Sequence, residues 1–412
     1  MSEQKNGFDK QRETRSGTEQ EYFPDRKAED ALPTPDTPSV PSEENEGKKV
    51  RKGLFRFLPV WFFVIVGVAA LCAVCHLLSL RSTAFANFMT DHVASVGRFL
   101  LAKLTNALPF SLAETLILCL PLIVVLFLLW AHRCLKQRKT GRPFFVLGGA
   151  LLVYYCMFVL TFACGYRTDR IDIRLGLTRQ DVSAEELAYT AQQLTEEVSA
   201  ASKKLTYGAD GFSVMPYSFD TMSEKLCDAY EALHTKYSFI QHYRTRVKPV
   251  ALSVAMSYCH VTGIYTTVTG EANLNIDFPD YSLPYTAAHE LAHQRGISRE
   301  DEANFVAFLV CLESEDDYIR YSGTLGMLEY TLNALYSASP ELYSDAYRAL
   351  PRAVRGELSA YAEFYKKYQH STAGKVNEAI NDTYLKFQGT EGTRSYGLAV
   401  DLAVAYYHSG KN

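Results

Sequence analysis

The sequence predicts an α+β protein that is mainly helical, in which three transmembrane helices precede a domain with a small β-sheet. Three observations support this fold class. Three apolar stretches are each long enough to cross a bilayer as a helix. The chain beyond them has mostly helical patterns, and a short group of β-branched and alternating segments lies in its middle. The 412 residues suffice for one or two domains with sizeable cores.

The first element, residues 1–54, is predicted to be a disordered cytoplasmic tail. Four prolines lie among Asp, Glu, Ser and Thr, at positions Pro33, Pro35, Pro38 and Pro41. Such a composition offers too little apolar surface to form a core.

Residues 55–165 are predicted to form a membrane anchor with spans at about 58–80, 112–132 and 144–165. The first stretch carries no Asp, Glu, Lys or Arg. About 55 residues precede it, which favours a signal anchor over a cleaved signal peptide. Pro121, inside the second stretch, is tolerated in membrane helices. The lipid bilayer is therefore an expected partner.

Clusters of basic residues predict how the anchor is oriented. One cluster precedes the first span and contains Lys48, Lys49, Arg51, Lys52 and Arg56. The other lies between the second and third spans and contains Arg133, Lys136, Arg138, Lys139 and Arg142. Because such clusters stay on the cytoplasmic side, both predict a multi-pass protein with a cytoplasmic N-terminus and an extracytoplasmic domain at residues 166–412.

The loop between the first two spans, Arg81 to Phe110, has apolar residues at helical spacing, including Phe88, Val96 and Leu100. This pattern predicts an amphipathic helix that lies on the outer membrane surface or against the domain.

The domain is predicted to open with a helix that Ser183 and Glu186 cap, followed by a helix through Leu226 to Leu233. Three strand-like segments come next, at Pro249–Val254, Val261–Val268 and Ala272–Ile276.

The cysteines of the domain are Cys227, Cys259 and Cys311, and they lack the paired spacing of a zinc ribbon. They are interpreted as buried thiols, and one disulfide bridge between two of them is the alternative.

The run His289-Glu290-Leu291-Ala292-His293 follows the strands, and Gly296 is placed to end its helix. On a helix, His289 and His293 share one face, so both imidazoles can reach one metal ion. Glu290 lies about 100° round the helix, where a general base can take a proton from water at the metal. The alternative is a helix with two solvated histidines.

A second helix is predicted to begin after Ser298, as N-cap, with Asp301 in a position like that of a capping box. Here the sequence resembles the gluzincin metallopeptidases, in which HExxH is followed on a second helix by the pattern E-x-x-A-[D/N]. Glu300-Asp301-Glu302-Ala303-Asn304 matches this pattern. The resemblance implies that Glu300 is the third metal ligand, with Glu302 as the alternative, and that Asn304 supports a motif histidine by a hydrogen bond.

A wider stretch resembles an uncharacterised bacterial family of membrane-anchored HExxH domains, known mainly as a domain of unknown function. The likeness rests on the runs Gly263-Ile264-Tyr265, Gly270 to Asn275, His289 to Gly296, Asn381 to Lys386 and Arg394 to Gly397. It implies a gluzincin-like domain in a bacterial cell membrane.

These observations predict a zinc metallopeptidase that hydrolyses a peptide or protein substrate, with Zn²⁺ held by His289, His293 and Glu300 and with Glu290 as catalytic base. The segment Gly263–Ile276 is the candidate edge for pairing with an extended peptide, and a simple hairpin is the alternative. By type of residue only, Tyr396 and Arg394 are candidates for stabilising the oxyanion.

Other function classes receive less support. The net charge of -4 gives no basis for nucleic-acid binding. A non-catalytic membrane sensor or scaffold is the alternative function, although an acid beside the metal has no use in a purely structural site. An intramembrane protease is disfavoured because polar residues such as Gln294, Arg295 and Arg299 surround the motif.

Overall fold

The structure is a computed structural model that describes residues 59–410, without the side chains of residues 395 and 396. The predicted tail, residues 1–54, lies outside the described residues.

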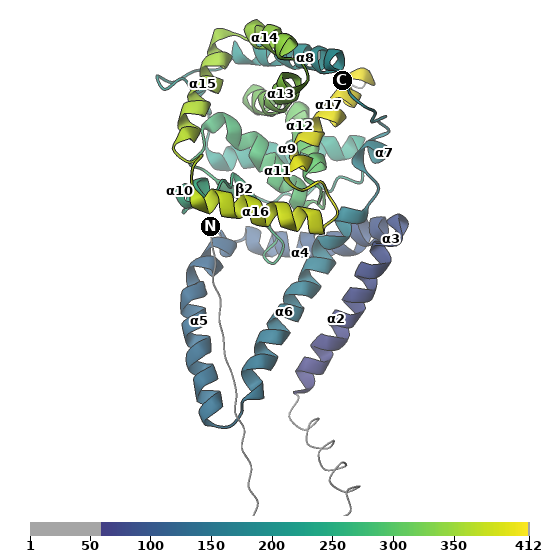
Figure 1. Ribbon diagram of the computed structural model, residues 1–412, viewed down its shortest axis with the longest axis vertical. Coiled ribbons are helices and arrows are strands. Elements are labelled where there is room, and N and C mark those ends of the chain that lie inside the picture. The colour runs from purple at the N-terminus through teal and green to yellow at the C-terminus, as the bar shows by residue number, and fades with distance from the viewer. Residues whose placement is uncertain (1–58, 411–412) are drawn as a thin grey trace, which may run out of the picture. The chain divides into compact units, whose positions relative to one another are not determined.

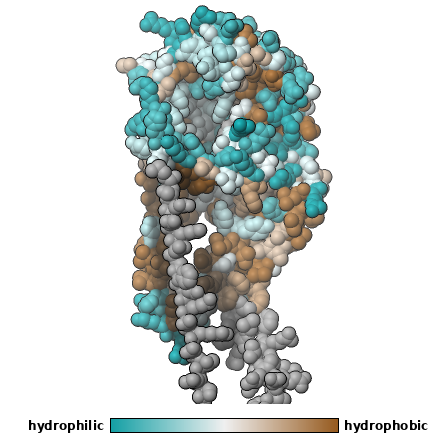
Figure 2. Space-filling view, viewed as in Figure 1, coloured by the Kyte–Doolittle hydropathy of each residue, from teal (hydrophilic) through white to brown (hydrophobic). Residues whose placement is uncertain are grey.

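In the described part, three helices are long and apolar enough to cross a membrane: α2 (Val60–Ser79), α5 (Leu112–Lys136) and α6 (Gly141–Thr161). They agree in length and composition with the three expected spans. The last helix ends at Thr161 rather than at residue 165, because the backbone leaves the helical conformation at Phe162 and a short 3-10 helix, Ala163–Arg167, follows. The face shown in Figure 2 is mainly hydrophobic over these helices and mainly hydrophilic over the domain.

The loop between α2 and α5 is helical throughout: α3 (Thr83–Phe88), a π-helical turn (Met89–Ala94) and α4 (Ser95–Asn106). Its apolar face is exposed, with Val96, Leu100 and Leu104 at 56%, 60% and 74%. The opposite face of α4 is buried and includes Arg98 and Ala102. One face of the segment therefore packs against the protein, and the other presents apolar side chains outward at the border between the spans and the domain (Figure 1). The expected placement on the outer membrane surface stays a prediction.

The domain is mainly helical, and its helices enclose one large apolar core. They are α7 (Ile171–Leu175), α8 (Ala184–Ser202), α9 (Phe219–Lys236), α10 (Ser253–Tyr258), α11 (Leu283–Gln294), α12 (Glu300–Glu313), α13 (Asp317–Ala338), α14 (Pro340–Ala349), α15 (Arg352–Lys366), α16 (Thr372–Phe387) and α17 (Ala399–His408). Ser183 and Glu186 form the predicted capping box at the start of α8. Short 3-10 helices lie at Asp280–Ser282 and Gly392–Leu398.

The sheet has three strands in the order β1-β3-β2: β1 (Lys248–Val250), β2 (Gly263–Thr266) and β3 (Glu271–Asn275). β1 runs parallel to β3, and β2 runs antiparallel to it. The prediction of a strand at Pro249–Val254 is wrong beyond Val250. The Ser253 hydroxyl donates to the Val250 carbonyl, and α10 begins at Ser253. β3 is buried at every position despite its alternating sequence, since the sheet is covered on both faces.

Reciprocal hydrogen bonds between carboxylates and backbone N–H groups join the membrane helix α5 to the sheet and to the segment that follows β1. The Glu271 carboxylate of β3 accepts hydrogen bonds from the backbone N–H groups of Leu112 and Ala113, at 3.0 and 2.9 Å, at the start of α5. In return, the Glu114 carboxylate of α5 accepts from the backbone N–H groups of residues 251 and 252, at 3.0 and 2.8 Å. The predicted anchor, from residue 57 on, and the predicted domain thus belong to one compact unit.

All nine cysteines are free thiols. Cys227 and Cys311 are buried and Cys259 is partly buried, which agrees with their interpretation as thiols and excludes the alternative bridge.

Candidate metal centre

The helix that carries the HExxH run ends in a turn that also orients one of its histidines. Gly296 follows α11 with a φ of +99°, a conformation that favours glycine. The Gly296 N–H bonds the His293 carbonyl and the Ile297 N–H bonds the Ala292 carbonyl, which is the hydrogen-bond pattern of a Schellman motif. This turn brings the Ile297 carbonyl to 2.7 Å from His293 Nδ1. The bond leaves Nε2 of His293 to face the first turn of α12.

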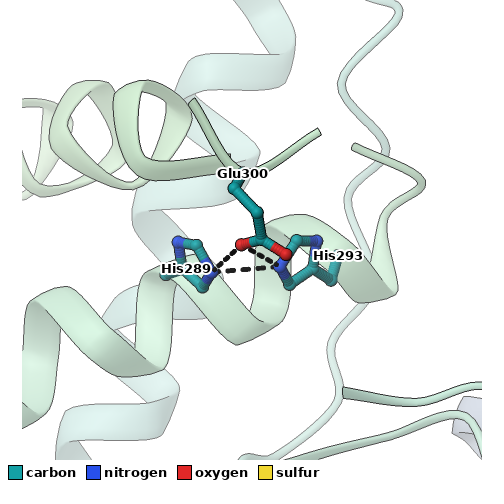
Figure 3. Close-up of side chains that lie close together, drawn as sticks. All are labelled: His289, His293 and Glu300. Carbon is teal, nitrogen blue, oxygen red and sulfur yellow. Dashed lines mark hydrogen bonds and ion pairs between the residues drawn. The ribbon is translucent and has the colours of Figure 1, made fainter. Parts of the chain in front are cut away.

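Three side chains converge between α11 and the start of α12 (Figure 3). The Nε2 atoms of His289 and His293 lie 3.0 Å apart. Glu300 Oε2 lies 3.3 Å from each of them. Glu302, the alternative, points elsewhere: its carboxylate accepts from the Ile171 N–H at 2.9 Å and pairs with Arg299 at 2.6 Å.

The three ligand atoms have the spacing that a metal ion requires. At metal–ligand distances of about 2.0–2.1 Å, tetrahedral coordination places neighbouring ligand atoms about 3.3 Å apart. In addition, Glu300 Oε2 is buried and, among the described residues, makes no hydrogen bond that would satisfy it. The separations, the two imidazoles with one carboxylate, and this unsatisfied oxygen all fit a bound divalent ion.

The electrostatics of the group favour a positive charge at the same point. Burial lowers the pKa of His293, but the carboxylates of Glu300 and Glu290 outweigh this effect and raise that pKa to about 9. Burial likewise favours the neutral form of Glu300, yet His293 and His289 hold the pKa of its carboxyl well below the usual range.

Glu290, the predicted base, lies beside this group and against strand β2. Burial raises the pKa of its carboxyl, and the charges of His289 and His293 oppose that shift. A Cβ atom at Gly263 of β2 would lie 2.6 Å from both Cγ and Oε1 of Glu290. Glycine at this position therefore lets the edge strand approach the carboxylate closely.

Two details of the predicted second helix are wrong. Ser298 does not cap α12, which begins at Glu300 with Arg299 as its N-cap. The Ser298 hydroxyl instead donates to the Phe162 carbonyl just beyond α6, at 3.0 Å. Asn304 does not support a motif histidine through Nδ1: in the described part, Nδ1 of His289 has no hydrogen-bond partner and Nδ1 of His293 faces Ile297.

The polar residues next to the motif are buried rather than solvated. Gln294 donates to the Gly270 carbonyl at 2.7 Å, and Arg295 donates to the Tyr243 carbonyl at 2.6 Å. The presence of these polar residues therefore does not indicate that the motif is exposed to solvent. The helix that carries the motif, α11, is nevertheless not among the three candidate spans.

A cavity of about 1060 Å³ borders the three ligands and Glu290. Its wall includes strand β2, which lies in the segment expected to pair with a peptide. It also includes residues of α6, α13 and α16, which the sequence did not connect with the site. Tyr330 and Tyr384 both line it, and burial raises the pKa of each to about 12, so both hydroxyls keep their protons at neutral pH. Among the described side chains, Arg394 is exposed and is not part of this wall, and the side chain of Tyr396 is not described.

His260 also lines this cavity. Its Nδ1 lies 2.7 Å from the Glu378 carboxylate of α16, and its Nε2 lies 2.8 Å from the Tyr368 carbonyl. His260 thereby fastens α16 to the segment that leads into β2. No spacing in the sequence could reveal this contact, because the two segments are far apart in the chain.

Fold and site together define a membrane protein with a buried His-His-Glu group that can hold a metal ion beside a large cavity. The model of a family of proteins of unknown function, DUF3810, matches residues 92–404, and the chain belongs to this family. This confirms the resemblance to a family of unknown function. No curated protein and no solved structure matches the chain.

Proposed function

We propose that this protein is a membrane-anchored zinc metallopeptidase of the gluzincin type that hydrolyses peptide bonds. The observation that supports it most is the convergence of His289, His293 and Glu300, with Glu290 buried beside them at the edge of a cavity. A scaffold with a structural metal has no need for a carboxylate at that place or for an open cavity beside it.

The chemistry follows from the side chains. A zinc ion held by His289, His293 and Glu300 would acidify a water molecule and polarise the peptide carbonyl. Glu290 would take the proton of the attacking water and return it to the leaving amine nitrogen. The protonated hydroxyls of Tyr330 and Tyr384, which line the same cavity, are able to donate to the developing oxyanion.

Strand β2 supports a peptide as the substrate. The Asn275 N–H bonds the Thr262 carbonyl, so alternate residues along this edge pair with β3. Gly263 and Tyr265 lie between them and turn their backbone groups to the other side, where the Tyr265 N–H bonds the Glu290 carboxylate. An extended peptide that pairs with this edge at Gly263 would pass next to Glu290.

The test uses the full chain purified in detergent with zinc supplied, and a degenerate peptide library analysed by mass spectrometry. Wild type should bind one zinc per chain and cleave the library. Glu290→Gln should keep the zinc and lose cleavage by about 10²–10⁴-fold, the usual contribution of a general base. Glu363→Gln, at an exposed position on α15, is the matched control and should behave as wild type. Folded wild type without metal, or undiminished cleavage by Glu290→Gln, would refute the mechanism.

The basic clusters beside the spans support an extracytoplasmic domain. Protease added to intact cells should therefore degrade the domain. Protection until the membrane is disrupted would contradict this orientation.

A further inference from the structure

The candidate metal centre lies directly at the end of a membrane helix. The Phe162 ring, one residue beyond α6, lies 5.8 Å from the His293 ring. The Arg98 guanidinium of α4 donates to the Thr161 carbonyl at 2.9 Å, and a Cβ at Gly296 would lie 2.4 Å from the same guanidinium. The turn that orients His293 is therefore packed against the end of α6 and against α4.

The cavity beside the metal residues continues down this membrane helix. Tyr154 and Phe158 of α6 are part of its wall, together with Glu290 and Glu300. Thr161 is the last residue of α6, so these two side chains lie about 10 Å and about 5 Å along the helix from its domain end. Because α6 is one of the spans, the cavity reaches from the metal residues into the half of the bilayer on the domain side.

Apolar side chains surround the place where the cavity meets the membrane. On α16, Val376, Ile380, Tyr384 and Phe387 form one helical face, and Phe387 is 82% exposed. This face is directed toward α6, because the Tyr384 and Phe158 rings lie 6.5 Å apart. α16 and α4 both lie at the border between the spans and the domain in Figure 1. Side chains of this kind are stable at the bilayer surface and would be unfavourable in water.

The spans α5 and α6 expose apolar side chains against which a transmembrane helix of a partner can pack. Figure 1 shows α5 and α6 diverging from their connecting turn toward the domain. Along α5, side chains such as Leu116 and Leu120 are exposed, and on α6 Leu151 and Tyr154 are exposed. Tyr154 is both exposed and part of the cavity wall, so the outer surface of α6 meets the cavity at this residue.

We infer that the substrate of this site is a polypeptide anchored in the same bilayer by a transmembrane helix, cleaved in the extended segment that leaves the membrane beside α6. This inference rests on the proposed peptidase function. The scissile bond should lie within about five residues of the end of the substrate's helix, because a strand advances about 3.3 Å per residue and the metal residues lie so close to the end of α6. The free edge of β2 would pair with this segment.

The test compares peptide sets that differ only in their distance from the membrane. The full chain is reconstituted into liposomes with random octapeptides joined directly to a leucine-alanine helix of about 20 residues, in either chain direction. A second set has a glycine-serine linker of about 20 residues between helix and octapeptide, and a third set has no helix. The direct set should be cleaved about 10- to 20-fold faster than the linked set, because effective concentration falls with roughly the 3/2 power of linker length.

Variants on α6 provide the second readout. Tyr154→Ala removes part of the cavity wall in the membrane and should slow cleavage of the direct set about tenfold, with the free octapeptides unaffected. Val153→Ala, at an exposed position of the same helix that is not part of the wall, is the control and should leave both rates unchanged.

The outcomes separate this inference from the function on which it rests. Equal cleavage of direct and linked sets, or cleavage of free octapeptides only, would overturn the membrane-anchored substrate and leave the peptidase intact. A fourth set carries a palmitoyl chain in place of the helix, and its preferential cleavage would indicate a lipopeptide substrate and also overturn the inference. Absence of cleavage in every set, with zinc bound, would overturn both proposals.

Discussion

Replacement of Gly263 by alanine tests the position of Glu290 without touching a metal ligand. The added Cβ would lie 2.6 Å from Cγ and Oε1 of Glu290, whereas ordinary contacts begin at 3.4 Å. The carboxylate would have to retreat by the difference, about 0.8 Å. Because a misplacement of about 1 Å can cost 10²-fold in rate, we expect Gly263→Ala to lower kcat/KM by about 10²-fold.

The assay measures peptide cleavage, zinc content and thermal unfolding of the same preparation. Zinc should stay at the wild-type level, because the three nearest atoms to the new Cβ all belong to Glu290. Gly356→Ala is the matched control: no atom lies within 4 Å of its Cβ position on α15, so activity should not change. Wild-type cleavage by Gly263→Ala would refute the role of Glu290, and loss of zinc would refute the local nature of the contact.

Three further predictions concern the metal residues and the core. Zinc analysis should show that Glu300→Ala loses the metal and Glu302→Ala keeps it, while Glu302→Ala unfolds more readily because its buried ion pair is broken. Gly296→Ala should weaken zinc binding about 10- to 100-fold in a competition with a chelator, since the turn that holds His293 requires a positive φ. Burial raises the pKa of Glu329 to about 7. In the folded state this carboxyl therefore keeps its proton up to about pH 7, whereas in the unfolded chain it loses the proton near pH 4.5. The free energy of unfolding should then fall by at most about 3 kcal/mol as the pH rises between these values, and denaturant titrations of Glu329→Gln should lack this component.

Local patterns in the sequence predict much of the fold. The spans follow from the length of their apolar runs, and the capping box at Ser183 and the turn at Gly296 depend only on neighbouring residues. The spacing of His289 and His293 puts them on one face of any helix. Local patterns also explain one error: the run after Pro249 has strand-like residues, but the strand ends at Val250, whose carbonyl accepts a hydrogen bond from the Ser253 hydroxyl.

The parts that the sequence leaves open depend on contacts between distant segments. Glu300 and Glu302 share the first turn of one helix, and only the angle at which α12 leaves the turn decides which one faces the histidines. Tyr154 and Tyr384 join the cavity because a membrane helix and a late domain helix meet there. No periodicity within either segment carries that information.

The reciprocal hydrogen bonds between α5 and the sheet segments have a consequence for how the protein folds during its synthesis. A nascent chain whose second span has not entered the membrane would carry a buried Glu271 without its two N–H partners. Strand β3, which packs against the helix α11 that carries both histidines, would then be destabilised. We therefore expect the domain to fold fully only after insertion, so that the proposed activity would begin only in the membrane. Pulse-labelled chains solubilised in detergent and treated briefly with a low dose of protease, which digests only unfolded chains, should become resistant only after α5 and α6 have inserted. Resistance gained before insertion would contradict this order.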